Sequence, residues 1–456
     1  MNIYILVEIT SRELDSKLLL AILAAARGHQ VILSDLEGLL EGTEKGILAP
    51  GIFLTKSLTP TDHKLKYLQF FIDKGFKVTS LDEEAGVSLT GYEEFSKTRF
   101  SDKSIELASA VFGWGDDDAD TLKKKYSKYA SKIHKTGSPR VDLWKSKFSN
   151  YWKMPKSAPQ KPFLLVSSNM GLSNGYMKMH ELYEMSHKFG YYDRDPNLIK
   201  DQFIRTSESM LKTGAFIEAI KYLGNNNNND YDIIFRPHPI ENIEAWKIYL
   251  DGIPNVHVIR EGSISPWVKN AFAVMHNGCT TAIETIVSKK PLVTYVPFET
   301  SFDKNTPNHL GHRAKSPEEL SNILKSIFIN TKSEGQNENR NETSKIIDRK
   351  VFLDKNELAA EKIIKLWENL IDNNHSSSSN WIMFRWLLRK NKIRKLIGIA
   401  RRKLLGTFKE NNKFPPFKQD DIFSRIDRFQ NTLGIKDLKC ELLSDRTILI
   451  KGKKII

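Results

Sequence analysis

The sequence predicts an α/β protein of two doubly wound domains facing a cleft, followed by a basic helical C-terminal tail. Short apolar runs with strand character alternate with amphipathic helical stretches over residues 1–330, as in parallel sheets covered by helices. Polar residues directly follow several of these runs, where the carboxyl ends of parallel strands bind ligands. Most of the excess positive charge lies after residue 375.

The composition suits a globular enzyme better than a nucleic-acid-binding protein. The 456 residues, 40% of them hydrophobic, suffice for two domains and an appendix. The net charge is +14, but residues 1–374 hold 49 basic and 48 acidic residues, so the body is nearly neutral. The two cysteines do not indicate a zinc site or a disulfide framework. Since the first residues also lack the basic region of a signal peptide, we expect a cytoplasmic protein.

The N-terminal domain, expected over residues 1–150, opens with a strand–helix–strand unit. The strand at Asn2–Val7 precedes an amphipathic helix at Glu13–Arg27, which Gly28 ends, and the next strand is Gln30–Leu33. Further strands are expected at Gly51–Leu54, Lys77–Leu81 and Ala110–Gly113, and helices at about Thr61–Lys74 and Ala119–Tyr129.

A second α/β domain is expected over residues 160–330, after a stretch without clear periodicity at 145–161. It begins with a strand at Pro162–Ser167 and contains a long helix from about Asn197 to Leu223. Two more strands are expected at Tyr231–Phe235 and Ala271–Met275, closing helices within 331–374, and the basic tail over 375–456.

An acidic cluster follows the strand that ends at Leu81. A carboxylate of Glu83 or Glu84 at a strand end could take a proton from an acceptor hydroxyl. The alternative is an acidic first turn of a helix that complements the helix dipole.

The turn Gly137–Pro139 is followed by Arg140 and Asp142. A carboxylate held near an arginine stays ionised and could act as a nucleophile. A structural Arg–Asp pair would account for the same residues. The acidic run Asp116–Asp120 could bind a metal, but a solvated helix start explains it more simply.

The segment from Phe235 to Pro297 predicts a nucleotide-phosphate pocket. Arginine, histidine, hydroxyl and amide side chains recur there after strands, and such groups donate to phosphate. Glu284 could bind ribose or base hydroxyls, or pair with an arginine. The candidate binding residues are Arg236, His238, Ser263, Asn277, Thr280, Thr281 and Glu284.

Taken in order, six segments resemble the bacterial surface-carbohydrate (capsule or lipopolysaccharide) biosynthesis proteins related to retaining β-Kdo glycosyltransferases. The resemblance covers residues 1–330. The segments are Ser11–Lys17, Gly51–Ser57, Leu81–Glu84, Gly137–Asp142, Arg236–Pro239 and His276–Thr281.

The resemblance implies a GT-B-like fold in which two Rossmann-like domains hold a CMP-activated sugar in the cleft between them, with the acceptor on the N-terminal side. It implies that His238 contacts the CMP phosphate, and that Glu83 or Glu84 supplies the catalytic acid/base group. Asp142 is our choice for the nucleophile of a retaining, double-displacement reaction.

Kdo carries its own carboxylate, so its site needs an additional cation. The candidates from the N-terminal motifs are Arg12, Lys17, Lys56 and Arg140. CMP has a single phosphate, so we expect neither a metal nor another cofactor. A glycan or lipid-linked glycan is the expected acceptor.

Two other hypotheses remain. The same fold could use a UDP- or GDP-sugar, or the chain could be a non-catalytic glycan-binding or scaffold protein. A nucleic-acid partner would rest on the tail alone, and we expect none.

The tail combines basic residues with tryptophan, phenylalanine and leucine. Nine basic residues fall between Arg385 and Lys403, with no acidic residue between Asp372 and Glu410. A basic amphipathic helix of this kind suits the headgroup region of an anionic membrane. We therefore expect the protein to lie peripherally on the inner face of the cytoplasmic membrane, unless the apolar residues of the tail pack on the body.

Overall fold

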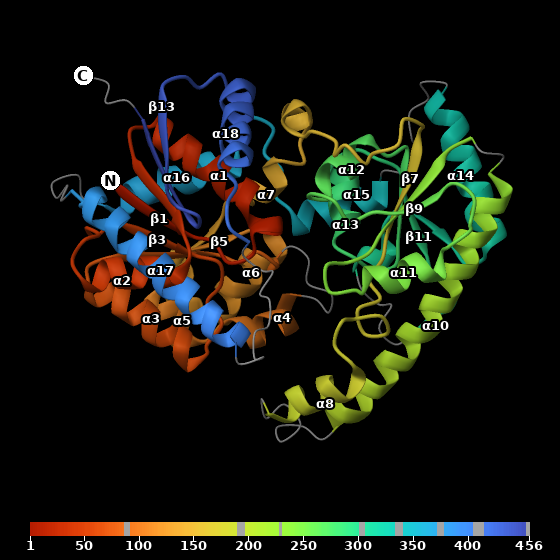
Figure 1. Ribbon diagram of the computed structural model, residues 1–456, viewed down its shortest axis with the longest axis horizontal. Helices are drawn as coiled ribbons and strands as arrows, with labels where there is room; N and C mark the ends of the chain where they lie inside the picture. The colour runs from red at the N-terminus through yellow and green to blue at the C-terminus, as the bar shows by residue number, and fades with distance from the viewer. Residues whose placement is uncertain are drawn as a thin grey trace. The chain divides into compact units, whose positions relative to one another are not determined.

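The computed structural model describes residues 1–85, 92–188, 197–227, 230–300, 306–332, 341–371, 378–404 and 415–452. They form two compact α/β units, each with its own sheet (Figure 1). Unit 1 comprises the described residues of 1–151 and 346–456, and unit 2 those of 152–345. The predicted fold class, two Rossmann-like α/β units, is confirmed.

The sheet of unit 1 has the strand order β13-β14-β2-β1-β3-β4-β5-β6, and the strands from β2 to β6 are parallel. Because β1 lies between β2 and β3, successive crossovers run in opposite directions from it, which makes the β1/β3 border a topological switch point. The strands are β1 (Asn2–Leu6), β2 (Gln30–Ser34), β3 (Ile52–Thr55), β4 (Lys77–Leu81), β5 (Ala110–Gly113), β6 (Ile133–Lys135), β13 (Leu438–Ser444) and β14 (Thr447–Gly452).

Helices with identifiable starts connect these strands. Asp35 accepts a hydrogen bond from Gly38 N at the start of α2, and Thr61 accepts one from Lys64 N at the start of α3. The helices of unit 1 are α1 (Thr10–Ala26), α2 (Leu36–Glu44), α3 (Asp62–Asp73), α4 (Tyr92–Arg99), α5 (Asp102–Leu107), α6 (Asp116–Lys125), α7 (Pro139–Asp142), α16 (Ala359–Leu370), α17 (Trp381–Leu404) and α18 (Gln419–Leu433), with the 3₁₀ helices η2 (Ser127–Lys132) and η3 (Ser146–Tyr151).

The C-terminal part of the chain is built into unit 1. Trp367 of α16 is buried and donates to Thr79 of β4, and Phe429 of α18 stacks on Tyr151 at 3.9 Å between ring centroids. Beyond the expected helices, β13 and β14 form a hairpin whose second strand pairs antiparallel with β2. Figure 1 shows these blue elements beside the red N-terminal strands. The sequence analysis did not predict this hairpin. Helix α16 packs on α1 within the same unit.

The sheet of unit 2 is parallel, with the order β12-β11-β10-β7-β8-β9. Its first strand, β7, lies between β8 and β10, so the β7/β10 border is the switch point of this unit. The strands are β7 (Phe163–Ser167), β8 (Asp232–Arg236), β9 (Val256–Val258), β10 (Ala273–His276), β11 (Leu292–Tyr295) and β12 (His312–Ala314).

A large apolar cluster forms much of the core of unit 2. Phe216 and Ile220 of the long helix α10 pack there with Trp246 and the inward side chains of the strands. The helices are α8 (Met179–Lys188), α10 (Asn197–Asn226), α11 (Ile243–Tyr249), α12 (Ser265–Asn270), α13 (Thr281–Val287), α14 (Pro317–Lys332) and α15 (Asn341–Lys350, whose last residues belong to unit 1), with the 3₁₀ helix η4 (Thr306–His309).

Candidate functional site

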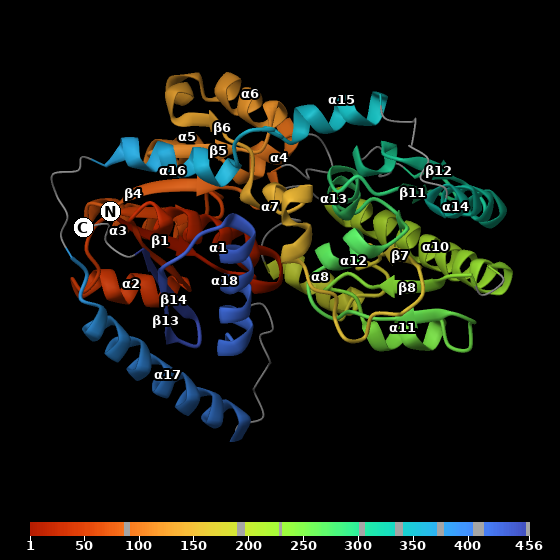
Figure 2. The same cartoon turned by 90° about the horizontal axis from the view of Figure 1, so that it is seen from above.

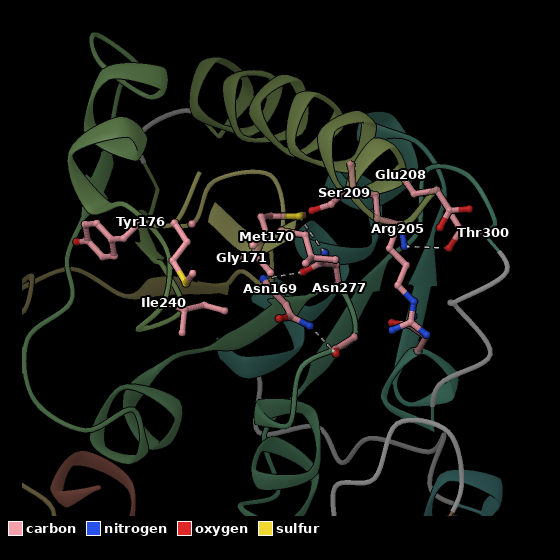
Figure 3. A pocket seen from close by; sticks show the side chains of 17 residues that line it. Asn169, Met170, Gly171, Tyr176, Arg205, Glu208, Ser209, Ile240, Asn277 and Thr300 are labelled. Atoms are coloured by element: carbon pink, nitrogen blue, oxygen red, sulfur yellow. Dashed lines mark hydrogen bonds between the residues drawn. The ribbon is translucent and has the colours of Figure 1, made fainter. Parts of the chain in front are cut away.

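A pocket of about 570 Å³ opens at the switch point of unit 2 (Figure 3). Asn169 follows β7, and Asn277 and Gly278 follow β10, so the pocket lies at the carboxyl ends of the two central strands. Its other walls are the loop 170–177, Leu182, Ile240, Thr300, Asn308 and one face of α10. We refer to it as the unit 2 pocket.

The face of α10 that lines the pocket is polar and carries two cations. Arg205, Glu208, Ser209 and Lys212 are spaced at i, i+3, i+4 and i+7, which places them on one side of a helix. Lys212 Nζ lies 3.4 Å from Thr300 Oγ1. The wall therefore combines two cations and the carboxylate of Glu208 with apolar surface from the loop 170–177, a mixture that is common in small-molecule sites.

A neutral histidine holds the turn whose residues Asn277 and Gly278 line the pocket. His276 is fully buried at the end of β10, and its Nδ1 accepts hydrogen bonds from Gly278 N at 2.9 Å and Cys279 N at 3.4 Å. Thr294 Oγ1 donates to Leu310 O, so it accepts from His276 Nε2–H at 2.8 Å. Burial lowers the pKa of His276 to about 3. A proton on Nδ1 would remove both backbone bonds, so this geometry needs the neutral ring.

The turn after His276 is held from both sides. Gly278 has φ of 87°, and a Cβ there would lie 3.1 Å from the side chain of Asn308. Asn277 Oδ1 accepts from Asn169 N at 3.1 Å, and Asn169 Nδ2 donates to Gly278 O at 3.2 Å. The two strand ends of the switch point are thus joined by amide hydrogen bonds, which Figure 3 shows as dashed lines.

The loop after β7 is fixed by a buried carboxylate. Glu241 accepts from Met170 N and Ser168 Oγ, both at 2.8 Å, and from Trp246 Nε1 at 2.6 Å. Burial raises the pKa of this carboxyl group. Since its donors are protein groups, Glu241 supports the pocket wall.

The predicted binding residues of unit 2 fall into two groups. Asn277 lines the pocket, whereas Thr281 is buried with its Oγ1 3.2 Å from Ser167 Oγ. Arg236 is buried and donates to the backbone carbonyls of Glu261 and Gly262, so it supports the loop before α12. Burial lowers the pKa of Arg236 to about 10.

The remaining predicted residues lie around this loop. His238 is exposed after β8, and its Nδ1 accepts from Ile240 N at 3.3 Å. Ser263 is half-buried before α12, and Thr280 is half-buried before α13. Glu284 is buried on α13 near Arg236, whose charge it helps to hold.

In unit 1 the switch point is filled by a network of ion pairs, which we call the charge cluster. It lies at the carboxyl ends of β1, β3 and β4, and its members are Glu8, Arg12, Glu13, Lys17, Lys56, Asp82, Glu83, Glu84 and Arg99.

Lys17 is the buried centre of the charge cluster. Its Nζ lies 2.7 Å from Glu13 Oε2, 3.4 Å from Glu83 Oε1 and 2.7 Å from Leu6 O. Burial opposes ionisation of Glu13, but Lys17 outweighs it and the pKa of this carboxyl falls to about 2. Burial raises the pKa of Glu83. Two carboxylates that share one ammonium group thus differ in their affinity for a proton.

The outer part of the charge cluster is accessible. Arg12 binds Glu84 at 2.8 Å, and Arg99 binds both Asp82 at 3.0 Å and Glu84 at 2.9 Å. The Glu84 side chain is 41% exposed and that of Arg12 is 26% exposed, whereas that of Lys17 is only 4% exposed. Of the predicted sugar-carboxylate cations, Arg12 can therefore meet a ligand directly and Lys17 cannot.

Lys56 and Arg140 are partly exposed. Lys56 Nζ lies 2.6 Å from Glu8 Oε2, and these residues follow β3 and β1, so the pair bridges the switch point of unit 1. Arg140 lies over the ring of Trp144 at 5.6 Å, and its charge lowers the otherwise raised pKa of Glu83. Both cations therefore lie at partly exposed positions near the cluster.

Asp142 holds the start of a helix. Its Oδ2 accepts from Ala360 N at 3.2 Å, in the first turn of α16, and its Oδ1 lies 2.9 Å from Lys145 Nζ. The side chain is buried, and burial raises its pKa. These contacts are those of a helix-capping carboxylate.

The acidic run at the start of α6 has a structural role as well. Asp118 is buried and accepts hydrogen bonds from Trp114 N, Gly115 N and Ala119 N at 2.6–2.9 Å. Within the described ranges, no group of three or more histidine, cysteine, aspartate or glutamate side chains could hold a metal ion.

The sequence analysis missed Glu13, His276 and the cations of α10. Glu13 and Lys17 are four residues apart in the first helix, a spacing that signals an ion pair. Arg205 and Lys212 are seven apart in a long predicted helix, which places them on one face. His276 lies inside a quoted motif, but its acceptor role depends on tertiary contacts.

No known protein family matches the chain, and no curated protein sequence matches it. Solved structures show distant similarity. A Listeria monocytogenes protein assigned as a UDP-N-acetylglucosamine 2-epimerase is 13% identical with a TM-score of 0.49, covering 83% of this chain and 99% of its own. The UDP-GlcNAc 2-epimerase of Methanocaldococcus jannaschii, in complex with UDP-GlcNAc and UDP, is 14% identical with a TM-score of 0.45, covering 81% and 100%.

The wall teichoic acid polymerase TagF is 11% identical with a TM-score of 0.39, and the match covers 70% of this chain and 71% of that chain. With all three TM-scores below 0.5, these similarities identify neither a family nor a substrate. The described part of the chain contains no helix that is long and apolar enough to cross a membrane.

Proposed function

We propose that the chain is a glycosyltransferase of surface-polysaccharide assembly that transfers Kdo or a related acidic sugar from a CMP-activated donor to a glycan. The observation that carries the proposal is the unit 2 pocket. It lies at a switch point, has the volume of a small-molecule site and combines two cations with amide and apolar groups. The choice of CMP and Kdo rests on the resemblance of the sequence motifs.

In the pocket, Arg205 and Lys212 are the groups suited to a phosphate, and the amides of Asn169 and Asn277 suit the edge of a base or ribose hydroxyls. Arg236 and Glu284 act through the loop they support. His238 stays a candidate phosphate donor because it is exposed after β8. A monophosphate needs less positive charge than a pyrophosphate, in keeping with two cations.

In unit 1 we assign proton transfer to Glu83 or Glu84. Burial raises the pKa of Glu83, which suits a general acid or base, whereas Glu84 is the more exposed carboxylate, with 41% of its side chain exposed against 5% for Glu83. Glu13 is the carboxylate that stays ionised, and we assign it, rather than the helix-capping Asp142, the stabilisation of positive charge on the sugar. Because its side chain is fully buried, it would act through the field of the charge cluster and not by contact. Arg12, Lys56 and Arg140 are the cations proposed to bind the sugar carboxylate.

Nucleotide binding tests the pocket. CMP at about 100 times its dissociation constant should add about 2.7 kcal/mol of stability, with much less from UDP and GDP at equal concentration. The double variant Arg205→Gln/Lys212→Gln should abolish this effect, whereas Lys200→Gln/Lys221→Gln, on α10 but outside the pocket, should retain it. Equal stabilisation by the three nucleotides would contradict the CMP-specific donor and favour a broader class of donors that includes UDP-sugars.

Transfer assays test the carboxylates. Either Glu83→Gln or Glu84→Gln should lose transfer while keeping CMP binding, and the variant that does so identifies the acid/base group. Asp142→Asn should keep both if it only caps α16. Two observations together would restore Asp142 as the nucleophile of a retaining reaction: a folded but inactive Asp142→Asn variant, and a sugar adduct on the wild-type enzyme seen by intact-mass spectrometry. If neither CMP-Kdo nor UDP- and GDP-sugars turn over, the chain is a glycan-binding or scaffold protein.

The proposal also places the protein on the inner face of the cytoplasmic membrane, where lipid-linked glycans are extended. The basic C-terminal region is the support for this location.

A further inference from the structure

Helix α17 has one apolar face that packs on unit 1. Phe384, Leu387, Leu388 and Asn391 are buried there, and α17 contacts α2. A Cβ added at Gly42 of α2 would lie 2.7 Å from the Phe384 ring, so the two helices meet closely. Figure 2 shows α17 along the outside of unit 1, next to α2 and the β13–β14 hairpin. This face of α17 is therefore buried against the core of unit 1, as in other globular proteins.

A second apolar face of α17 points away from unit 1. Its side chains recur at intervals of four and seven residues, which keeps them on one stripe of a helix. Ile382 is nine residues, or two and a half turns, from the buried Asn391, so the stripe lies opposite the packed face. The stripe consists of Ile382, Trp386, Ile393, Ile397 and Leu404, each between 60% and 88% exposed. So many exposed apolar side chains in line mark an interaction surface.

Basic residues flank this stripe. Three other cations of α17 form ion pairs with the rest of unit 1. The pairs are Arg385–Glu441, Lys392–Asp445 and Lys395–Glu37. In contrast, Arg389, Arg394 and Arg401 form no ion pair within 4 Å with any described residue, although the charge of Arg394 helps to lower the pKa of Glu41. These three guanidinium groups beside the stripe are therefore available to an anionic partner.

We propose that the outer face of α17 docks on a lipid bilayer that contains anionic headgroups, with the helix lying along the surface. The apolar stripe would enter the headgroup–acyl boundary while the flanking guanidinium groups bind phosphate. A second copy of the same face would bring like charges together, so charge complementarity favours the membrane. The inference deepens the proposed membrane location and is independent of the sugar donor.

Cosedimentation of the full chain with vesicles tests it. Vesicles of phosphatidylcholine with phosphatidylglycerol should bind the protein at low salt, and vesicles of phosphatidylcholine alone should bind it much less. Trp386→Gln/Ile393→Gln should reduce partitioning about 100-fold, since interfacial binding scales with buried apolar area. The matched control is Tyr249→Gln/Ile248→Gln, an aromatic and an isoleucine exposed on α11 of unit 2, and it should bind like the wild type.

The electrostatic contribution is tested with the triple variant Arg389→Gln/Arg394→Gln/Arg401→Gln. It should bind anionic vesicles more weakly than the wild type, and its binding should depend less on salt. All variants should keep the wild-type circular dichroism and CMP response, so a failure of docking is separable from a failure of the enzyme. Absence of vesicle binding at low salt, or equal binding by Trp386→Gln/Ile393→Gln, would overturn the proposal. Self-association that this double variant abolishes would assign the face to a second copy instead.

Discussion

The two units carry different kinds of polar groups at the same topological position, the switch point of the sheet. At the switch point of unit 2 the strand ends are joined by neutral amide and imidazole hydrogen bonds, and a pocket remains open. At that of unit 1 the strand ends carry ions of both signs that fill the space around Lys17. A neutral framework holds its shape without a ligand, whereas an ionic one depends on every partner. The two units should therefore differ in what destabilises them: the loss of one ion in unit 1, and protonation of the neutral framework in unit 2.

Lys17→Met should have the largest effect, because it leaves Glu13 and Glu83 buried without their shared cation. We expect a loss of about 3–5 kcal/mol in the free energy of unfolding of unit 1, measured by urea denaturation and by hydrogen exchange of β1 amides. Lys45→Met is the control, since it removes an exposed pair with Glu41 and should cost at most about 1 kcal/mol. Equal losses would mean that the cluster is not a buried ionic framework.

Acidification from pH 6.5 to 4 should weaken unit 2 more than unit 1. Burial also lowers the pKa of His29 and His134 in unit 1, but these two are only partly buried, whereas His276 is fully buried. As pH falls below 6.5 the unfolded chain protonates His276 while the folded chain does not until about pH 3, so stability is lost across that window. By pH 4 the loss is about 3 kcal/mol. For Glu13, whose pKa is lowered to about 2 from 4.5, stability is present above pH 4.5 and is lost only as pH falls from there towards 2.

Thermal unfolding between pH 7 and 4 checks this order. His276→Gln should flatten the pH dependence of unit 2, although its stability at neutral pH is lower. His180→Gln, an exposed histidine of the same unit, should leave the dependence unchanged. An unchanged slope in His276→Gln would show that another group controls the acid response.

Gly278→Ala should cost about 1–2 kcal/mol, because alanine is strained at a positive φ and its Cβ would press on Asn308. The same change should weaken CMP binding, since Gly278 and Asn308 both line the pocket. Gly252→Ala has a similar φ and no neighbour within 4 Å, so it isolates the backbone cost and should leave CMP binding intact. Isothermal calorimetry with both variants separates the two effects.

The smallest effect is expected for Glu84→Gln. Its carboxylate is 41% exposed and pairs with Arg12 and Arg99 in contact with solvent, so the stability change should stay below about 1 kcal/mol. The same urea denaturation assay measures the change. A loss of unfolding free energy as large as that of Lys17→Met would show that the outer ion pairs belong to the buried framework.

Local pattern accounts for most of the elements. The expected strand at Gln30–Leu33 is β2, and the expected helix from Asn197 to Leu223 is α10, because period and strand-like composition are properties of neighbouring residues. Asn277 was placed correctly at a strand end for the same reason, and it lines the pocket.

Long-range partners could not be predicted in this way. Asp142 meets the backbone of Ala360, more than 200 residues later, and no local feature distinguishes such a helix-capping carboxylate from a nucleophile. The pairing of Ile450 with Val31 is equally remote in sequence. The apolar run Thr447–Ile450 after a turn is a strand signal, but the basic composition of the tail outweighed it.

The β14 strand also sets an order of assembly. Unit 1 begins at the N-terminus, yet the strand that pairs with the edge of β2 leaves the ribosome about 300 residues after Tyr151, or about 15–60 s later at ordinary rates of synthesis. During that interval the edge of β2, with its buried apolar residues Val31, Ile32 and Leu33, has no partner strand from this hairpin. Unit 2, whose described residues all lie between 152 and 345, can fold in the meantime. The unit that is started first is thus the one completed last, and a nascent chain needs protection at that edge until its final strand arrives.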